Sequence, residues 1–408
     1  MPHHFTDIAI VILLAALAAV FSSKLKQQPF IGYVLAGVIM GPSVLGILDN
    51  EEDIRFFAEL GVILLLFILG MELPLRTFRN IYRQALTSTL ALVLLSFALT
   101  FLVGHMVDLS LKERIVYGFI MSLSSTAVAV KLLDGVDMLN NVTGQLAISI
   151  LIAQDLIFIP MIMAINAMGA DADGFSWILA SKIVAAMVLL VGLVMFLSKR
   201  QRVRLIFEKS VERHSDLIPV AALAWCFAGA GLSEWAGMTP AYGAFLAGLV
   251  IGNSHSKDKV LPRIEPMQSV LLMVFFLSIG LLIDLDIIAQ HFKSIMVLLV
   301  SVLVFKTFVC IVLLRVFMPN EHWGSSFIAG LTISQIGEFS FILAATALNN
   351  GILNNESYKI IIAIIALNLA VSPIWMAVMR RFVQVSYVDK TAPTFMEALK
   401  QTTAKILE

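Results

Sequence analysis

Charged residues are scarce in this chain. Only 14% of its 408 residues are Asp, Glu, Lys or Arg, whereas a soluble globular domain carries about a quarter. Hydrophobic residues make up 59% of the chain, and the mean hydropathy is +0.93. Apolar runs of roughly 20 residues recur from end to end, and this length crosses the hydrocarbon core of a bilayer. The composition therefore predicts an all-α polytopic membrane protein.

Cysteine is almost absent. Cys226 and Cys310 are the two cysteines, and both lie in apolar runs, so we interpret them as small core residues without a disulfide framework. The seven histidines fall at the ends of runs or in loops, and no pair of them makes a convincing metal site. No nucleophile, base and orienting group cluster on one segment. We therefore expect neither an enzyme nor a bound cofactor, and no nucleic-acid partner.

We count 13 hydrophobic segments and expect a transmembrane helix at each. They span approximately 5–23, 30–47, 54–72, 84–106, 113–133, 141–166, 176–198, 217–234, 239–253, 267–284, 292–317, 325–348 and 357–379. With the N-terminus outside, 21 of the 28 Lys and Arg residues fall in inner loops or the C-terminal tail, and six fall outside. Basic loops stay cytoplasmic, so this split predicts a multi-pass protein of the cell (inner) membrane with a cytoplasmic C-terminus.

An internal repeat is visible in the sequence. PFIGYVLAGVIMG at 29–41 and PAYGAFLAGLVIG at 240–252 share six of 13 positions at an offset of 211, and Gly70 matches Gly280 at an offset of 210. Generic close packing by GxxxG is the simpler explanation of either segment alone. Because the repeat spans seven helices, an odd number, its second copy is inserted upside down, which is typical of alternating-access transporters.

The repeat predicts the domain organisation. We expect a transmembrane transporter domain over 1–385, with repeat one at about 5–166, a linker helix at about 176–198 and repeat two at about 217–380. A short cytoplasmic tail follows at 386–408.

Two corresponding spans are unusually polar. SLSSTAVAV at 122–130 contains Ser124, Ser125 and Thr126, and TISQIGEFS at 332–340 contains Gln335 and Glu338. Hydroxyls can re-satisfy backbone groups that are freed when a helix unwinds. The alternative is that Ser and Thr bond back to the i−4 carbonyl of an intact helix. The symmetric placement favours two broken helices that cross near the membrane midplane.

Asp155 is the only charged residue between Asp137 and Asp171, and Gln154 directly precedes it. A carboxylate at bilayer depth costs about 2.5–3.5 kcal/mol on insertion scales, so it usually carries a proton or meets an ion. One carboxylate offers one negative charge for a proton and a monovalent cation to share. This competition predicts electrically silent exchange, one for one, with Asp155 as the metal ligand and with Gln154, Ser124, Ser125 and Thr126 as the other ion- and proton-binding residues.

Two further charges lie inside membrane segments. Lys306 needs a partner in lipid, and we expect it to neutralise Asp155 when no cation is bound; snorkelling to the surface is the alternative. Glu338 is the second charge. It is expected to hold the crossed helices in place, with direct ion binding as the alternative.

These motifs together resemble the monovalent cation:proton antiporter-2 family, the Kef-type potassium/proton antiporters. The matching pieces include GYVLAGVIMGP at 32–42, FAELGVILLLFILGMEL at 57–73, AQDLIFIP at 153–160 and QIGEFSFIL at 335–343. The resemblance covers about residues 5–380. It implies 13 helices, a dimerisation domain and a mobile core domain, usually in a homodimer. It also implies that Asp155 carries the ion and the proton beside Ser124, Ser125 and Thr126.

The Gln154–Asp155 pair resembles the potassium-type members, whereas sodium-type relatives more often carry Asp-Asp or Asn-Asp. The chain departs from full-length Kef proteins because it stops at Glu408, without a strand-associated GxGxxG or room for their nucleotide-binding domain. The chain is then either a short family member, with a separate cytoplasmic subunit as a candidate regulator, or a form from which the ligand-sensing part was removed. We expect K⁺/H⁺ antiport by alternating access, with Na⁺/H⁺ antiport on the same scaffold as the first alternative.

Other classes of transport protein are less well supported. A gated K⁺ channel would carry a carbonyl-lined filter such as TVGYG, which is absent from the sequence. A symporter of anions or organic solutes shares crossed helices in inverted repeats. The lone Asp155 and the lack of a basic binding cluster argue against an anionic substrate.

Overall fold

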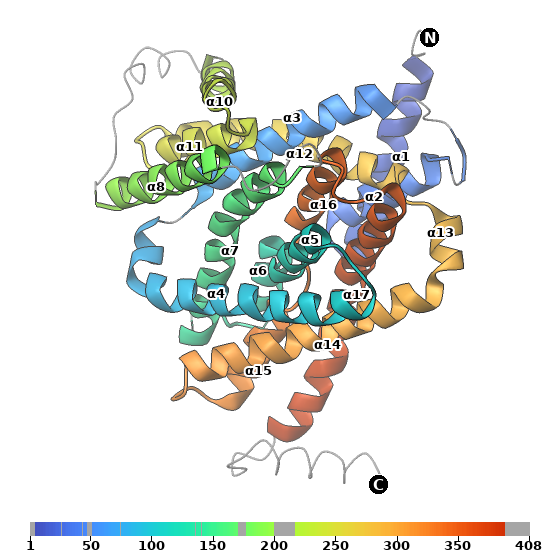
Figure 1. Ribbon diagram of the computed structural model, residues 1–408, viewed down its shortest axis with the longest axis vertical. Coiled ribbons are helices and arrows are strands. Elements are labelled where there is room, and N and C mark those ends of the chain that lie inside the picture. The colour runs from blue at the N-terminus through green and yellow to red at the C-terminus, as the bar shows by residue number, and fades with distance from the viewer. Residues whose placement is uncertain are drawn as a thin grey trace. The chain divides into compact units, whose positions relative to one another are not determined.

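The computed structural model describes residues 5–25, 27–42, 44–46, 51–73, 75–134, 136–139, 141–169, 177–199 and 217–387. Within these residues every regular element is a helix, as predicted (Figure 1). The helices are α1 (Phe5–Lys24), α2 (Pro29–Met40), α3 (Glu51–Glu72), α4 (Leu75–Met106), α5 (Leu111–Ser122), α6 (Thr126–Asp134), α7 (Val142–Ala167), α8 (Trp177–Lys199), α10 (Leu217–Trp235), α11 (Pro240–Gly252), α12 (Lys257–Leu281), α13 (Leu285–Gln290), α14 (Phe292–Phe317), α15 (Trp323–Thr332), α16 (Phe339–Asn349) and α17 (Asn355–Tyr387).

Each predicted span corresponds to one helix or to one broken pair. The predicted breaks are confirmed: α5 and α6 replace the span at 113–133, and α15 and α16 replace the span at 325–348. Within the described ranges, six helices are long and apolar enough to cross a membrane, and several shorter apolar helices, such as α2, α11 and α16, accompany them. The chain is therefore a multi-pass membrane protein.

Several helix boundaries differ from the predicted spans. The helix predicted at 267–284 begins earlier, at Lys257, and the one predicted at 84–106 begins at Leu75. Hydropathy detects the apolar part of a helix, whereas the backbone can stay helical through polar turns. The predicted tail at 386–408 lies outside the described residues, apart from Ser386 and Tyr387 at the end of α17.

The chain divides into two compact units. Unit 1 consists of Met1–Asn80, Leu156–His291 and Phe341–Ile362, and unit 2 consists of Ile81–Asp155, Phe292–Ser340 and Ala363–Glu408. Each unit takes helices from both predicted repeats.

In unit 1, the repeat-related glycines let helices pack at very short range. A Cβ at Gly37 of α2 would overlap Leu277 O and lie 2.8 Å from Gly280 Cα of α12. The repeat carries Gly37 to Gly248 and Gly280 to Gly70. A Cβ at Gly248 of α11 would correspondingly overlap Phe67 O and lie 3.2 Å from Gly70 Cα of α3. The contact between α2 and α12 therefore corresponds to the contact between α11 and α3, with the roles of the two repeats exchanged. The repeat in the sequence is thus also a repeat in helix packing.

In unit 2, the broken helices contribute to an apolar core. Buried side chains of α4, α6, α7, α14 and α15 form it, among them Leu92, Leu133, Leu146, Val309 and Ala329. This core places α7 and α14, the helices with the intramembrane charges Asp155 and Lys306, in the same unit as both breaks.

Candidate ion-binding site

The two broken helices touch at their breaks. Residues 123–125 separate α5 from α6, and residues 333–338 separate α15 from α16. Gly337 N donates to Leu123 O at 3.2 Å, and Ser124 Oγ donates to Ile333 O at 2.7 Å. A Cβ at Gly337 would lie 2.6 Å from Ser124 O, so only glycine allows this approach. Each break therefore satisfies backbone groups of the other in place of the lost helical bonds.

Lys306 of α14 ties both breaks together. Its side chain is 0% exposed. Nζ donates to Leu123 O at 2.6 Å, to Gln335 O at 3.0 Å and to Ser124 Oγ at 3.3 Å. These three acceptors match the three N–H donors of an ammonium group. Lys306 does not snorkel to the surface, and its pairing with Asp155 stays a prediction.

Asp155 and Gln154 reach the first break from α7. The two side chains are 2% and 1% exposed. Thr126 Oγ1 donates to Asp155 Oδ2 at 3.1 Å, and Ser124 N donates to Gln154 Oε1 at 3.0 Å. The structure thus brings Gln154, Asp155, Ser124 and Thr126 together. In this arrangement Gln154 offers its oxygen to the backbone of the break.

Glu338 lies in the second break and contacts the first one. The Ser125 hydroxyl donates a hydrogen bond to the Glu338 carboxylate. Its buried Oε2 atom has no hydrogen-bond partner among the described residues. Gln335 acts chiefly through its backbone: its Nε2 donates to Thr332 O at 2.8 Å, within its own segment, while its carbonyl accepts from Lys306.

The charges match the helix ends that they meet. A helix N-terminus carries partial positive charge and a C-terminus partial negative charge. Asp155 bonds to Thr126, the first residue of α6, and Glu338 directly precedes α16. Lys306 meets carbonyl groups just beyond the C-termini of α5 and α15. The arrangement places acids at two N-termini and the cation between two C-termini.

Asn368 of α17 is a residue that the sequence analysis missed. It is 0% exposed, and its Oδ1 accepts from Ile336 N of the second break at 2.8 Å. The pattern of intramembrane charges does not reveal Asn368, because an amide is neutral. A comparison of α7 with α17, the last helix of each repeat, could have found it.

Broken helices that meet beside a buried carboxylate, within two repeats of one fold, are typical of secondary transporters. The chain belongs to the sodium/hydrogen exchanger transmembrane family, because the sequence model of that family matches residues 10–380. Members of this family are cation/proton antiporters, not enzymes. The predicted membership of the cation/proton antiporters and the predicted fold class are therefore confirmed.

Two relatives and one solved structure illustrate the similarity. The iron transporter MagA of Paramagnetospirillum magneticum is 39% identical over 95% of this chain and 88% of that protein. K(+) efflux antiporter 5 of Arabidopsis thaliana is 27% identical over 90% of this chain, which spans 65% of the plant protein. The sodium proton antiporter MjNhaP1 from Methanocaldococcus jannaschii has a TM-score of 0.69 at 15% identity, over 98% of this chain and 99% of that one. This structural match shows the fold.

Proposed function

We propose that the protein exchanges K⁺ for H⁺, one for one, and that Asp155 binds the proton and the cation in turn. The observation that carries the proposal is the position of Asp155: its carboxylate is 2% exposed and accepts a hydrogen bond from Thr126 where α6 begins. A carboxylate buried at bilayer depth is a costly group that a helix keeps for a function.

Asp155 and Lys306 would work as a coupled pair in this mechanism. When no cation is bound, Lys306 offsets the charge of Asp155; a proton or K⁺ at the carboxylate releases it. Because the ammonium bonds to Leu123 O and Gln335 O, a change of charge at Asp155 acts on both broken helices. Ser124, Ser125 and Thr126 supply hydroxyl oxygens beside the ion, and Gln154 and Glu338 hold the breaks.

The preference for K⁺ is supported by the Gln154–Asp155 pair and by the plant relative whose name specifies K⁺ efflux. Na⁺/H⁺ exchange on the same scaffold is the main competing function. Another relative is named an iron transporter. Transition-metal sites generally combine several side-chain ligands, and the described ranges hold no group of three or more His, Cys, Asp or Glu residues that could hold a metal ion. A monovalent cation is therefore the better substrate.

The orientation and assembly are part of the proposal. The distribution of basic residues supports an outside N-terminus and a cytoplasmic C-terminus in the cell (inner) membrane. The family resemblance supports a homodimer, and a separate cytoplasmic subunit is a candidate regulator. Chemical cross-linking in the native membrane would test the dimer.

Exchange in proteoliposomes with an internal pH dye tests the proposed function. K⁺, Na⁺, Rb⁺, Li⁺ and Fe²⁺ are added outside in turn, and K⁺ and Rb⁺ are expected to release the most protons. Asp155→Asn should abolish exchange, because the neutral amide cannot carry the proton. Asp134→Asn, the same change at the exposed end of α6, is the matched control. Normal exchange by a folded Asp155→Asn protein would refute the mechanism, and exchange with Na⁺ alone would favour the sodium alternative.

A further inference from the structure

We propose that Asn368 is a positioning residue for ion exchange, and that it holds the second break as Gln154 holds the first. This inference rests on the proposed function, because it assigns Asn368 a part in the same ion site. Asn368 would act through the backbone, without touching the ion.

The first support is the contact between Asn368 and the second break. Residues 333–338 lack regular helical hydrogen bonds over most of their length. Asn368 Oδ1 accepts from the buried Ile336 N at 2.8 Å. Because only the carbonyl oxygen of an amide side chain can accept this bond, the orientation of the Asn368 side chain is determined.

The second support is the correspondence with Gln154. In the first repeat, Gln154 Oε1 accepts from Ser124 N of the break at 3.0 Å. In both side chains the nitrogen is buried and has no hydrogen-bond partner among the described residues. Both repeats therefore use a carboxamide oxygen, on their last helix, to hold a backbone N–H at the break.

The sequence separation fits this correspondence. Asn368 lies 214 positions after Gln154, against 211 for the repeat itself. The difference of three residues is close to one helical turn, so the side chain keeps nearly the same helix face. Gln154 is followed by Asp155, whereas Asn368 is followed by Leu369. The two repeats thus share the amide, while only the first carries the acid.

The third support is the cost of placing an amide there. A buried polar nitrogen without a partner is unfavourable, and an apolar side chain would fill a fully buried position without this cost. The bond to Ile336 N is the compensating interaction that the structure shows. Filling the core is therefore not a sufficient reason for an asparagine at this position.

The bond connects Asn368 to the ion site in two steps. Ile336 directly follows Gln335, whose carbonyl accepts from Lys306 Nζ. Gly337, on the other side, donates to Leu123 O, which Lys306 also binds. Loss of the Asn368 oxygen would free the 335–337 backbone. The Lys306 ammonium group, which offsets the charge of Asp155 in the proposed function, would then lose its fixed position.

Exchange kinetics test this role. Asn368→Leu removes the acceptor at similar size, and Asn368→Asp keeps an oxygen in the same place. We expect Asn368→Leu to raise the KM for the cation at least about fivefold, the low end of the effect of orphaning a buried group, and to displace the pH profile of exchange. Asn368→Asp should restore much of the wild-type KM. Ser372→Ala is the matched control, because Ser372 is buried one turn along α17 and its hydroxyl donates to Leu369 O of the same helix.

A second measurement does not depend on transport. Hydrogen exchange of residues 333–338, followed by mass spectrometry, should be faster in Asn368→Ala than in wild type or Ser372→Ala. Unchanged exchange there, or an Asn368→Leu protein with normal KM and pH profile, would overturn the role of Asn368. If the wild type transports no K⁺, the proposed function fails, while the hydrogen-exchange result still decides whether Asn368 holds the break.

Discussion

Lys306 is the residue on which both breaks depend. Its ammonium group donates to two backbone carbonyls and one hydroxyl and is fully buried. The sequence predicted a buried lysine near the carboxylate of Asp155. The carbonyl partners could not be predicted, because they are main-chain atoms that become available only where the helices open.

Replacement of Lys306 should destabilise the protein as well as alter transport. Lys306→Gln supplies fewer donors and leaves buried carbonyls without partners, so we expect a loss of about 3 kcal/mol. Thermal unfolding in detergent measures it. Lys293→Gln, at an exposed position of the same helix, should leave the unfolding temperature nearly unchanged. Equal unfolding temperatures for both variants would contradict the role of Lys306 in holding the breaks.

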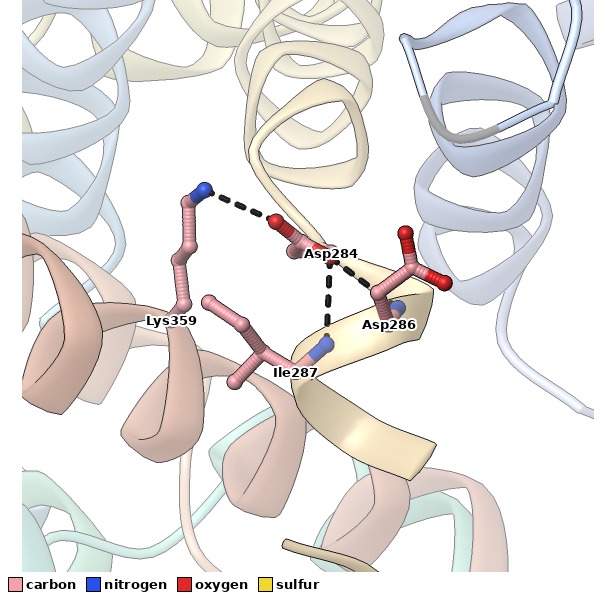
Figure 2. Close-up of polar contacts among 4 residues, drawn as sticks. All are labelled: Asp284, Asp286, Ile287 and Lys359. Atoms are coloured by element: carbon pink, nitrogen blue, oxygen red, sulfur yellow. Dashed lines mark hydrogen bonds and ion pairs between the residues drawn. The ribbon is translucent and has the colours of Figure 1, made fainter. Parts of the chain in front are cut away.

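At the scale of elements, α13 is held at both ends to the start of α17. Asp284 caps α13 by accepting from Asp286 N and Ile287 N, and Lys359 of α17 pairs with its other oxygen at 3.0 Å (Figure 2). At the far end, His291 lies 3.2 Å from Glu356. This six-residue helix was not predicted, because it is too short to produce a periodic pattern.

The Asp284 pair predicts a pH dependence of stability. The hydrogen bond from Lys359, followed by the one from Ile287 N, lowers the pKa of Asp284 below its ordinary value. A lowered pKa stabilises the fold above the unfolded value of about 3.9, and this contribution disappears as the pH falls through the folded pKa. Asp284→Asn should therefore lower the unfolding temperature at pH 7, by no more than about 2 °C for such an accessible pair, and should have less effect near pH 3. A larger effect at pH 3 would show the opposite linkage.

The glycine contacts of unit 1 give a prediction at the same scale. Gly248→Ala and Gly37→Ala each force a methyl group into a neighbouring backbone, so both should unfold at clearly lower temperature than wild type, by an amount typical of overpacking, about 1–3 kcal/mol. Gly231→Ala in α10 meets nothing within 4 Å and should be neutral or stabilising, because alanine favours a helix. A stable Gly248→Ala protein would contradict the packing described for α3 and α11.

For the whole molecule, the sequence predicted the membrane helices, both breaks and the repeat, because hydropathy, serine-rich polarity and spacing are properties of short stretches of sequence. The sequence did not reveal which glycines of different helices contact each other. The pairing of Gly37 with Gly280 and of Gly70 with Gly248 joins positions far apart in the chain. Asn368 was missed for the same reason, since its role depends on a contact with Ile336.

Electroneutral exchange is the prediction that belongs to the whole molecule. With one carboxylate shared by H⁺ and a monovalent cation, no net charge crosses the membrane in a cycle. The rate in proteoliposomes should stay constant when an imposed membrane potential changes sign. A rate that follows the potential would require a second charge to move with the ion.

The most direct test of a shared carboxylate is the apparent KM for K⁺ measured at several pH values. If H⁺ and K⁺ compete for Asp155, this KM should rise about tenfold for each pH unit below the pKa of the site, while the maximal rate at saturating K⁺ changes little. A KM that does not vary with pH would show that proton and cation bind at separate places, and would contradict the account.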